Sequence, residues 1–325
     1  MRARILLTEE LLPISVDSIE GESGPGYCLR ALERNATDIH TLCMKLRISG
    51  LNGFNQSDAV FLSQLFKADV VWFKQMMPAT TRNFEWQQHR WYRSSDLRFT
   101  VPQVCPTCVH RNGWIKAAWD FSLSTVCIEH QCALVDACPS CPRSLSWYRP
   151  APGIARCRHV IRSNPKESKP AELLLEFQSW VEARLALNQD QSFGAPSHLS
   201  RWRILKDVSL PGWVCLMEAF GLKPMDAPYQ PPLFPPRFRP NKIWREIITR
   251  ALVRIEHFEQ QEVKNWSEWK AEIQQFPLLR MATVHQHPGD QSLAAMLLEK
   301  IFSYRASVRL TKRHAHWGQM QLFEV

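Results

Sequence analysis

Apolar residues recur three and four positions apart along most of the chain, which is the spacing of helices with one buried face. Between residues 24 and 78 this pattern predicts two pairs of short helices, the last of which ends at Pro78. Asn35 and Thr37 are the turn and N-cap candidates within the first pair. The residues expected to face inward are Leu29, Leu32, Ile39, Leu42, Leu46, Val60, Phe61 and Leu65. Paired short helices suit a helix-turn-helix, although an ordinary helical bundle produces the same pattern.

The segment after these helices has a different pattern. Residues 80–100 are rich in Trp, Arg and His and predict a connector without strand-like alternation. Three large rings within seven residues are seldom left exposed in a linker, so Trp86, Trp91 and Tyr92 are expected to pack between the helices and the next segment. Further helices are predicted at residues 171–187, 210–222, 241–261, 267–276 and 291–305. The predicted fold class is therefore mainly α.

Seven of the ten cysteines lie between Cys105 and His159, in close pairs that histidines complete. Six of them form two groups, each with three thiols and one imidazole, which is the donor set of a closed tetrahedral zinc site. The pattern thus predicts two structural zinc ions per chain. The ligands of the first are Cys105, Cys108, Cys127 and His130, and those of the second are Cys138, Cys141, Cys157 and His159.

Other roles for these cysteines fit the pattern less well. Disulfides need an oxidising compartment, a catalytic zinc needs an open coordination position, and a redox motif needs a βαβ pattern. Cys132 is an alternative fourth ligand, but His130 is preferred because its distance from Cys127 along the chain matches that of the partner pair. The cysteines expected to be buried core thiols are Cys28, Cys43, Cys132 and Cys215.

The cysteine block divides the chain into three predicted parts. Residues 1–100 are an N-terminal helix-turn-helix domain, 101–165 a tandem zinc-binding module, and 166–325 a helical C-terminal domain. The chain has 40 Lys and Arg against 31 Asp and Glu, a formal charge of +9 that fits nucleic acid or an acidic protein partner. Two zinc sites with three thiolates each would lower this charge to about +7.

Several function and location classes are disfavoured. With only 12 glycines the chain holds no Gly-rich phosphate-binding loop. Its first residues lack a secretory signal, and no apolar stretch is long enough to span a bilayer. We therefore expect a cytoplasmic protein without a membrane partner, and a reducing compartment favours metal binding over disulfides.

Two motifs carry a resemblance to a known family. The order Cys-x2-His-x3-Leu-x3-Cys-Pro-x-Cys runs from Cys127 through Leu134 to Cys141, and Glu22-Ser23 precedes the first predicted helix. Over residues of about 20 to 160 the chain resembles the TniQ family, the target-site selectors of multi-protein transposons, which include the TnsD branch. It departs from the family pattern in two places. Gly24-Pro25-Gly26 follows where the family usually continues directly into helix, and His159 stands where many members have Cys.

This resemblance implies a non-catalytic adaptor. Family members select a target and pass it to an AAA+ regulator, which recruits the transposase. Some read a DNA attachment site directly, whereas others dock as homodimers on an RNA-guided CRISPR effector. The expected partners are thus a Cascade-like effector with its guide RNA, the target DNA, the AAA+ regulator and a second copy of the chain. A conventional DNA-binding regulator is the alternative, and a metal-dependent enzyme is the third possibility.

The two leading hypotheses differ in what the candidate recognition helices must carry. A direct reader needs a helix studded with Arg, Lys, Asn or Gln, but both candidate helices are largely apolar, which favours docking on protein. A basic C-terminal segment could instead touch a nucleic-acid backbone, although such a segment is often only a solvated end. The candidate contact residues are Lys45, Arg47, Lys74, Gln75, Arg309, Lys312 and Arg313. The apolar surface of Met76-Met77 and of residues 292–302, together with the resemblance, predicts the homodimer.

Overall fold

The computed structural model describes residues 12–46, 58–77, 84–87, 90–93, 96–98, 100–163, 169–186, 201–223, 239–260, 266–285 and 287–302. These residues are mainly helical, as the sequence predicts. The chain divides into two compact units: a first unit of residues 1–191 with 234–245, and a second unit of residues 192–233 with 246–325. The three-part division at residues 100 and 165 stays a prediction. Among the described residues no helix is both long and apolar enough to cross a membrane.

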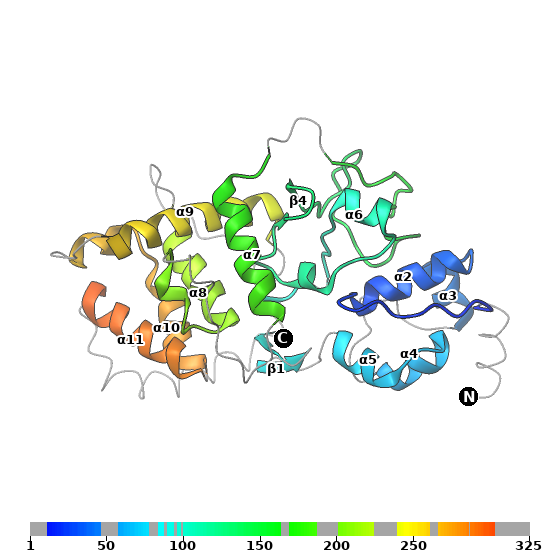
Figure 1. The fold of residues 1–325 in the computed structure, drawn as a ribbon, viewed down its shortest axis with the longest axis horizontal. Coiled ribbons are helices and arrows are strands. Elements are labelled where there is room, and N and C mark those ends of the chain that lie inside the picture. The colour runs from blue at the N-terminus through cyan, green and yellow to red at the C-terminus, as the bar shows by residue number, and fades with distance from the viewer. Residues whose placement is uncertain are drawn as a thin grey trace. The chain divides into compact units, whose positions relative to one another are not determined.

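The first unit begins with the two expected pairs of short helices (Figure 1). They are α2 (Gly24–Arg34), α3 (Ile39–Leu46), α4 (Ala59–Phe66) and α5 (Val70–Met76). Aspartates rather than Thr37 cap them: the carboxylate of Asp38 accepts the backbone N–H of Thr41 at 2.8 Å. Asp69 does the same for α5 by accepting the N–H of Trp72 at 2.6 Å. The helix pairs are present, and their helix-turn-helix arrangement stays a prediction.

Tyr27 holds three of these helices together. Its ring lies edge-on to Phe66, Trp72 and Phe73 at centroid distances of 5.9, 5.0 and 5.5 Å, an arrangement favoured by the ring quadrupoles. The expected inward positions of α2 and α3 are buried. Val60 was assigned inward wrongly, because it is 52% exposed. The buried face of α4 runs through Ala59, Leu62 and Leu65, and Val60 is one residue, or about 100°, away from it.

The Gly24-Pro25-Gly26 segment forms the first residues of α2. The departure from the family pattern at these residues therefore does not move the start of the helix. Ser23 is the N-cap residue and Pro25 stands in the first turn, where the missing N–H is not needed. A Cβ on Gly24 would lie 2.7 Å from the carbonyl oxygen of Met76, and one on Gly26 would lie 2.9 Å from the Cβ of Ile115. The two glycines therefore allow α2 to approach both α5 and the cysteine block.

The predicted connector contains a β-hairpin, which the sequence analysis missed. Strands β1 (Phe84–Gln87) and β2 (Arg90–Arg93) pair antiparallel, with Trp86 opposite Trp91. Four residues are too few for strand alternation to stand out in a sequence, although aromatic residues favour strands. The side chains of Trp86, Trp91 and Tyr92 lie outside the described part of the structure, so their packing stays a prediction.

The cysteine block folds with little regular structure and joins the helices in one core. Its elements are α6 (Pro106–Arg111), the 3-10 turn η4 (Ala117–Asp120), β3 (Val126–Cys127) and β4 (Cys132–Ala133). One hydrophobic core contains Leu29 and Phe73 from the helices together with Ile115, Trp119 and Leu134 from the block. Helix α7 (Glu172–Ala186) packs on β3, and its Gln178 accepts the backbone N–H of Thr125.

The second unit is helical as predicted. Its elements are η5 (Arg203–Leu205), α8 (Leu210–Gly221), most of α9 (Asn241–Gln260), η7 (Trp266–Ala271), α10 (Gln275–Val284) and α11 (Pro288–Phe302). Helix α10 packs on both α8 and α11. Four apolar residues of α11, which are Ala294, Leu297, Leu298 and Ile301, are buried, and so is Met77 in the first unit. Much of the apolar surface from which the homodimer was predicted is therefore used inside the chain.

Candidate metal centres

Three thiols and one imidazole converge in the first metal cluster. It consists of Cys105, Cys108, Cys127 and His130, whose ligand atoms all lie within 4.8 Å of one another. The Nδ1 atom of His130 is 3.2 Å from the Sγ of Cys108 and 3.6 Å from that of Cys127. The Sγ atoms of Cys108 and Cys127 are 3.7 Å apart. Two sulfurs bound tetrahedrally to zinc at about 2.3 Å are about 3.8 Å apart, so this spacing fits such an ion.

Two short elements present these ligands. Cys105 is the N-cap of α6, and its sulfur accepts the backbone N–H of Cys108 at 3.5 Å. The β3–β4 hairpin carries Cys127 at its start and His130 in its tight turn, where Gln131 has a positive φ of 46°. The start of a helix and the turn of a hairpin thus face each other. The N–H bond from Cys108 to the sulfur of Cys105 favours the thiolate form that a metal ion needs.

The chemistry of the first cluster also calls for a cation. Burial, and then the neighbouring Cys127, raise the pKa of Cys108 to about 12. The hydrogen bond with Cys105, and then burial, raise the pKa of Cys127. Three buried thiols this close cannot all ionise by themselves, because each thiolate opposes the next. A bound divalent ion would supply the charge that stabilises all three.

Cys132 was expected to be an isolated buried core thiol, and the structure contradicts this. It is half-buried and its Sγ lies 3.6 Å from that of Cys105. In the hairpin register it stands directly opposite Cys127. The four-membered group contains His130 and not Cys132, which agrees with the preferred ligand set. The other three single cysteines are buried as predicted.

The second metal cluster has the same composition but lies nearer the surface. It consists of Cys138, Cys141, Cys157 and His159. The Sγ of Cys157 is 3.3 Å from that of Cys138 and 3.2 Å from that of Cys141. The Nδ1 of His159 is 3.3 Å from the sulfur of Cys157. Cys138 is buried, whereas His159 is exposed.

Two turns bring the second set of ligands together. The backbone N–H of Cys138 donates to the carbonyl of Arg143 at 2.8 Å, which closes the turn that carries both knuckle cysteines. The other turn is closed by the N–H of Ala155, which donates to the carbonyl of His159 at 2.9 Å. Arg158, which lies between the ligands Cys157 and His159, has a left-handed φ of 66°. This conformation lets ligands only two residues apart point to one centre.

Glu22 and Ser23 tie α2 to the first cluster's surroundings. Arg30 donates to both carboxylate oxygens of Glu22 at 2.7 and 2.6 Å, and both residues are buried. Burial raises the pKa of Glu22 against the opposing effect of Arg30. The hydroxyl of Ser23 donates to Asp120 at 2.8 Å, and its N–H donates to the carbonyl of Ile115. Ser23 therefore ties the start of α2 to the cysteine block, and the Glu22–Arg30 pair holds the segment before α2 against that helix.

Asp120 belongs to a buried pair of opposite charges. Burial raises its pKa to about 7, while the Ser23 hydrogen bond and the charge of Arg149 act the other way. Burial lowers the pKa of Arg149 to about 9, and Asp120 opposes this shift. Arg149 donates to the carbonyl of Ser146 at 3.0 Å. Neither residue was singled out in the sequence, where buried and exposed charges look alike.

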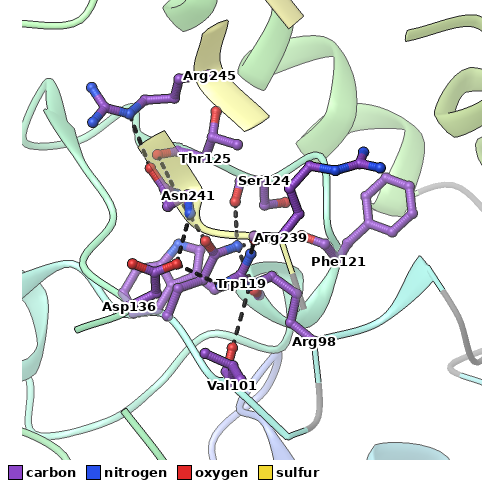
Figure 2. A network of polar contacts seen from close by, with 11 residues as sticks. Arg98, Val101, Trp119, Phe121, Ser124, Thr125, Asp136, Arg239, Asn241 and Arg245 are labelled. Carbon is purple, nitrogen blue, oxygen red and sulfur yellow. Dashed lines mark hydrogen bonds and ion pairs between the residues drawn. The ribbon is translucent and has the colours of Figure 1, made fainter. Parts of the chain in front are cut away.

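A second network joins the block to the start of α9 (Figure 2). The guanidinium of Arg98 is fully buried, and it donates to Asp136 at 2.7 Å and to the carbonyl of Arg239 at 2.5 Å. The backbone N–H of Asn241 donates to the same carboxylate at 2.6 Å. The Asn241 side chain donates to Gln103 at 2.8 Å. These contacts fix residues 239–245 to the cysteine block inside the first unit.

The predicted nucleic-acid contacts are placed only in part. Lys45 is exposed in the last turn of α3, and Lys74 is exposed on α5 beside the half-buried Gln75. The remaining candidates, Arg47, Arg309, Lys312 and Arg313, lie outside the described residues.

The second unit holds a thiol, an imidazole and a carboxylate in a row, which the sequence did not reveal. The Nε2 of His285 is 3.4 Å from the sulfur of Cys215, and its Nδ1 is 2.6 Å from Asp290. Burial opposes protonation of His285, but its bonds to Asp290 and Cys215 outweigh this and raise its pKa to about 9. Asp290 also accepts the N–H of Ser209, the N-cap residue of α8. All three side chains are buried, so the row stabilises helix ends and offers no access to a substrate.

Comparison with known families gives a match over the first part of the chain. The TniQ family model matches residues 13–134, which span α2 to α5 and the whole first metal cluster. The sequence-based resemblance is thereby confirmed over these residues, and the family is one of transposition-associated DNA-targeting proteins. The second metal cluster and the second unit lie beyond the match. Curated proteins give no match to the chain.

Proposed function

We propose that the chain is a non-catalytic target-site selection adaptor of a multi-protein transposon. It docks as a homodimer on an RNA-guided CRISPR effector in the cytoplasm and helps to recruit an AAA+ regulator and a transposase. The observation that carries this proposal is the TniQ match, because it covers the four short helices together with the first metal cluster. The alternative is a protein that reads an attachment site or operator directly.

We assign zinc to both metal clusters in this role. Each cluster offers four protein ligands, three sulfurs and one imidazole nitrogen, which is the composition of a closed structural site. Zinc bound there supplies folding free energy and leaves no coordination position for a substrate. This use of the metal agrees with an adaptor that performs no chemistry itself.

The exposed faces of the short helices support docking over DNA reading. Met44 on α3 is 68% exposed, Val60 on α4 is 52% exposed, and Val71 on α5 is 57% exposed. Helices that read DNA present Arg, Lys, Asn or Gln to the base edges. Protein interfaces are instead rich in apolar residues at their centres. These helices therefore suit a protein partner better than a major groove.

Affinity purification tests this proposal. The tagged chain should retain the effector subunits when they are co-expressed with guide RNA. The double variant Met44→Asp/Val71→Asp should lose at least ten-fold of this association, because buried charges at an interface centre are costly. Zinc content and melting temperature should stay unchanged, and Val253→Asp in the second unit is the matched control, since Val253 is 48% exposed.

The direct-reading alternative gives the opposite results. The isolated chain would then select one sequence from a DNA library, and Lys74→Ala or Gln75→Ala would relax its preference at a single base pair. Retention of the effector would be absent with or without guide RNA. Either finding overturns the docked-adaptor proposal.

A further inference from the structure

An open groove of about 840 Å³ lies beside the second metal cluster, within the first unit. Three segments form it: residues 134–142, the turn at 158–163, and the first residues of α9. Its basic side chains are Arg158, Arg162, Lys242 and Arg245. The end of the cysteine block supplies Arg158 and Arg162, and α9 supplies the other two, so two separate segments bring four cations to one concave surface. Apart from Leu134, the residues that line this groove lie beyond the TniQ match.

Among the described residues that line this groove, Asp136 is the single carboxylate, and its charge is already neutralised. Asp136 is bound by the buried guanidinium of Arg98 at 2.7 Å and by the backbone N–H of Asn241 at 2.6 Å (Figure 2). Its charge is therefore balanced by a guanidinium that is not one of the four cations of the groove. A zinc ion in the second cluster would leave about one negative charge there. The groove keeps an excess of about three positive charges.

Two of the four cations, Arg162 and Lys242, have no acidic partner among the described residues. Arg162 and Lys242 are exposed, and neither makes a hydrogen bond or ion pair within the described part of the chain. Arg245 is half-buried, and its Nε donates to the side chain of Asn241 at 3.0 Å, which orients it from the first turn of α9. The positive end of the helix dipole of α9 adds to the same potential.

We propose that this groove binds the sugar–phosphate backbone of a nucleic acid. Several exposed cations on one concave surface neutralise successive phosphates, and guanidinium groups pair with phosphate oxygens in a bidentate manner. Pro139, Pro142 and Val160 line the same groove and give the sugars an apolar surface. The contact carries no sequence information, because backbone contacts position a nucleic acid without reading bases. The proposal deepens the proposed function, on which it rests for the presence of guide RNA and target DNA.

The test measures binding of the full-length zinc-loaded protein to short labelled RNA, single-stranded DNA and duplex DNA at several salt concentrations. The double variant Arg162→Glu/Lys242→Glu should weaken binding by about tenfold or more at low salt, whatever the sequence. The slope of log affinity against log salt should become shallower by about two. Binding that is lost for RNA alone, or for DNA alone, identifies which backbone the groove takes.

A matched control changes the same charges elsewhere. Arg203 and Lys206 are exposed in the second unit and do not line the groove, so Arg203→Glu/Lys206→Glu should keep the wild-type affinity and salt slope. Unchanged zinc content and melting temperature in both variants show that folding is intact. The proposal is wrong if the wild-type chain binds none of these probes, if the groove variant binds as the wild type does, or if the groove takes only an acidic peptide such as polyglutamate.

These outcomes are separate from those of the adaptor proposal. If the groove variant binds nucleic acid normally while the chain still retains the effector, only the groove assignment fails. If the groove binds nucleic acid but the chain never retains the effector, the docked-adaptor proposal fails and the groove assignment stands.

Discussion

Cys105→Ser should reduce the zinc content of the purified protein from two ions per chain to one. The remaining ligands, Cys108, Cys127 and His130, leave a three-coordinate site that holds zinc far more weakly. Because the metal supplies folding free energy of roughly 10 kcal/mol or more in such sites, the first unit should melt at a much lower temperature. Cys138→Ser should likewise remove one ion, from the more exposed second cluster.

Elemental analysis of protein kept reduced and free of chelators measures this directly. Cys132→Ser is the matched control, because Cys132 lies 3.6 Å from Cys105 but outside the four-membered group. It should keep both ions. A wild-type chain with one ion or none would defeat the two-site assignment. Loss of an ion in Cys132→Ser but not in His130→Ala would show that the fourth ligand is the thiol.

Arg30→Ala should destabilise the first unit by about 3–5 kcal/mol. The substitution leaves the buried carboxylate of Glu22 without its two hydrogen bonds of 2.6–2.7 Å. It also removes the cation that lies 5.5 Å above the ring centre of Tyr27. An uncompensated buried charge costs more than the pair contributes, so Glu22 would have to take up a proton or unfold its surroundings.

Urea unfolding of Arg30→Ala and of a control variant, each compared with the wild type, gives the free energies of unfolding that check this prediction. Arg34→Ala is the control, since Arg34 is exposed at the end of the same helix and its loss should change stability by less than about 0.5 kcal/mol. The double variant Glu22→Gln/Arg30→Met should recover much of the loss, because it removes both charges together. Equal losses for Arg30→Ala and Arg34→Ala would show that the buried ion pair with Glu22 does not stabilise the first unit.

Spacing along the chain predicted the helices and the grouping of the expected metal ligands. The eight expected zinc ligands are the eight residues that the structure gathers in two groups. Close pairs such as Cys105 and Cys108 need only a tight turn to share one ion, so their geometry is local and readable from sequence. The burial of Leu29 and Leu42 was also predicted correctly. The period of a helix is likewise a local property, so the buried face can be read from the spacing of apolar residues.

Features that depend on distant residues could not be predicted. The buried Arg98 pairs with the half-buried Asp136, but nothing local distinguishes these residues from solvated charges. Asn241 lies 105 residues from Asp136, and its role in holding α9 depends on that contact. Val60 was misplaced because a two-turn helix contains too few residues to define its buried face by pattern alone.

The most direct measurement of the central claim is a count of insertions. A transposon is supplied with its transposase, AAA+ regulator and a guide-programmed CRISPR effector, with or without this chain, and insertion sites are sequenced. The account predicts that insertions beside the guide-matched site require the chain, and that Met44→Asp/Val71→Asp abolishes them while Val253→Asp does not. Guide-directed insertion at an unchanged frequency without the chain would contradict its role as the target selector.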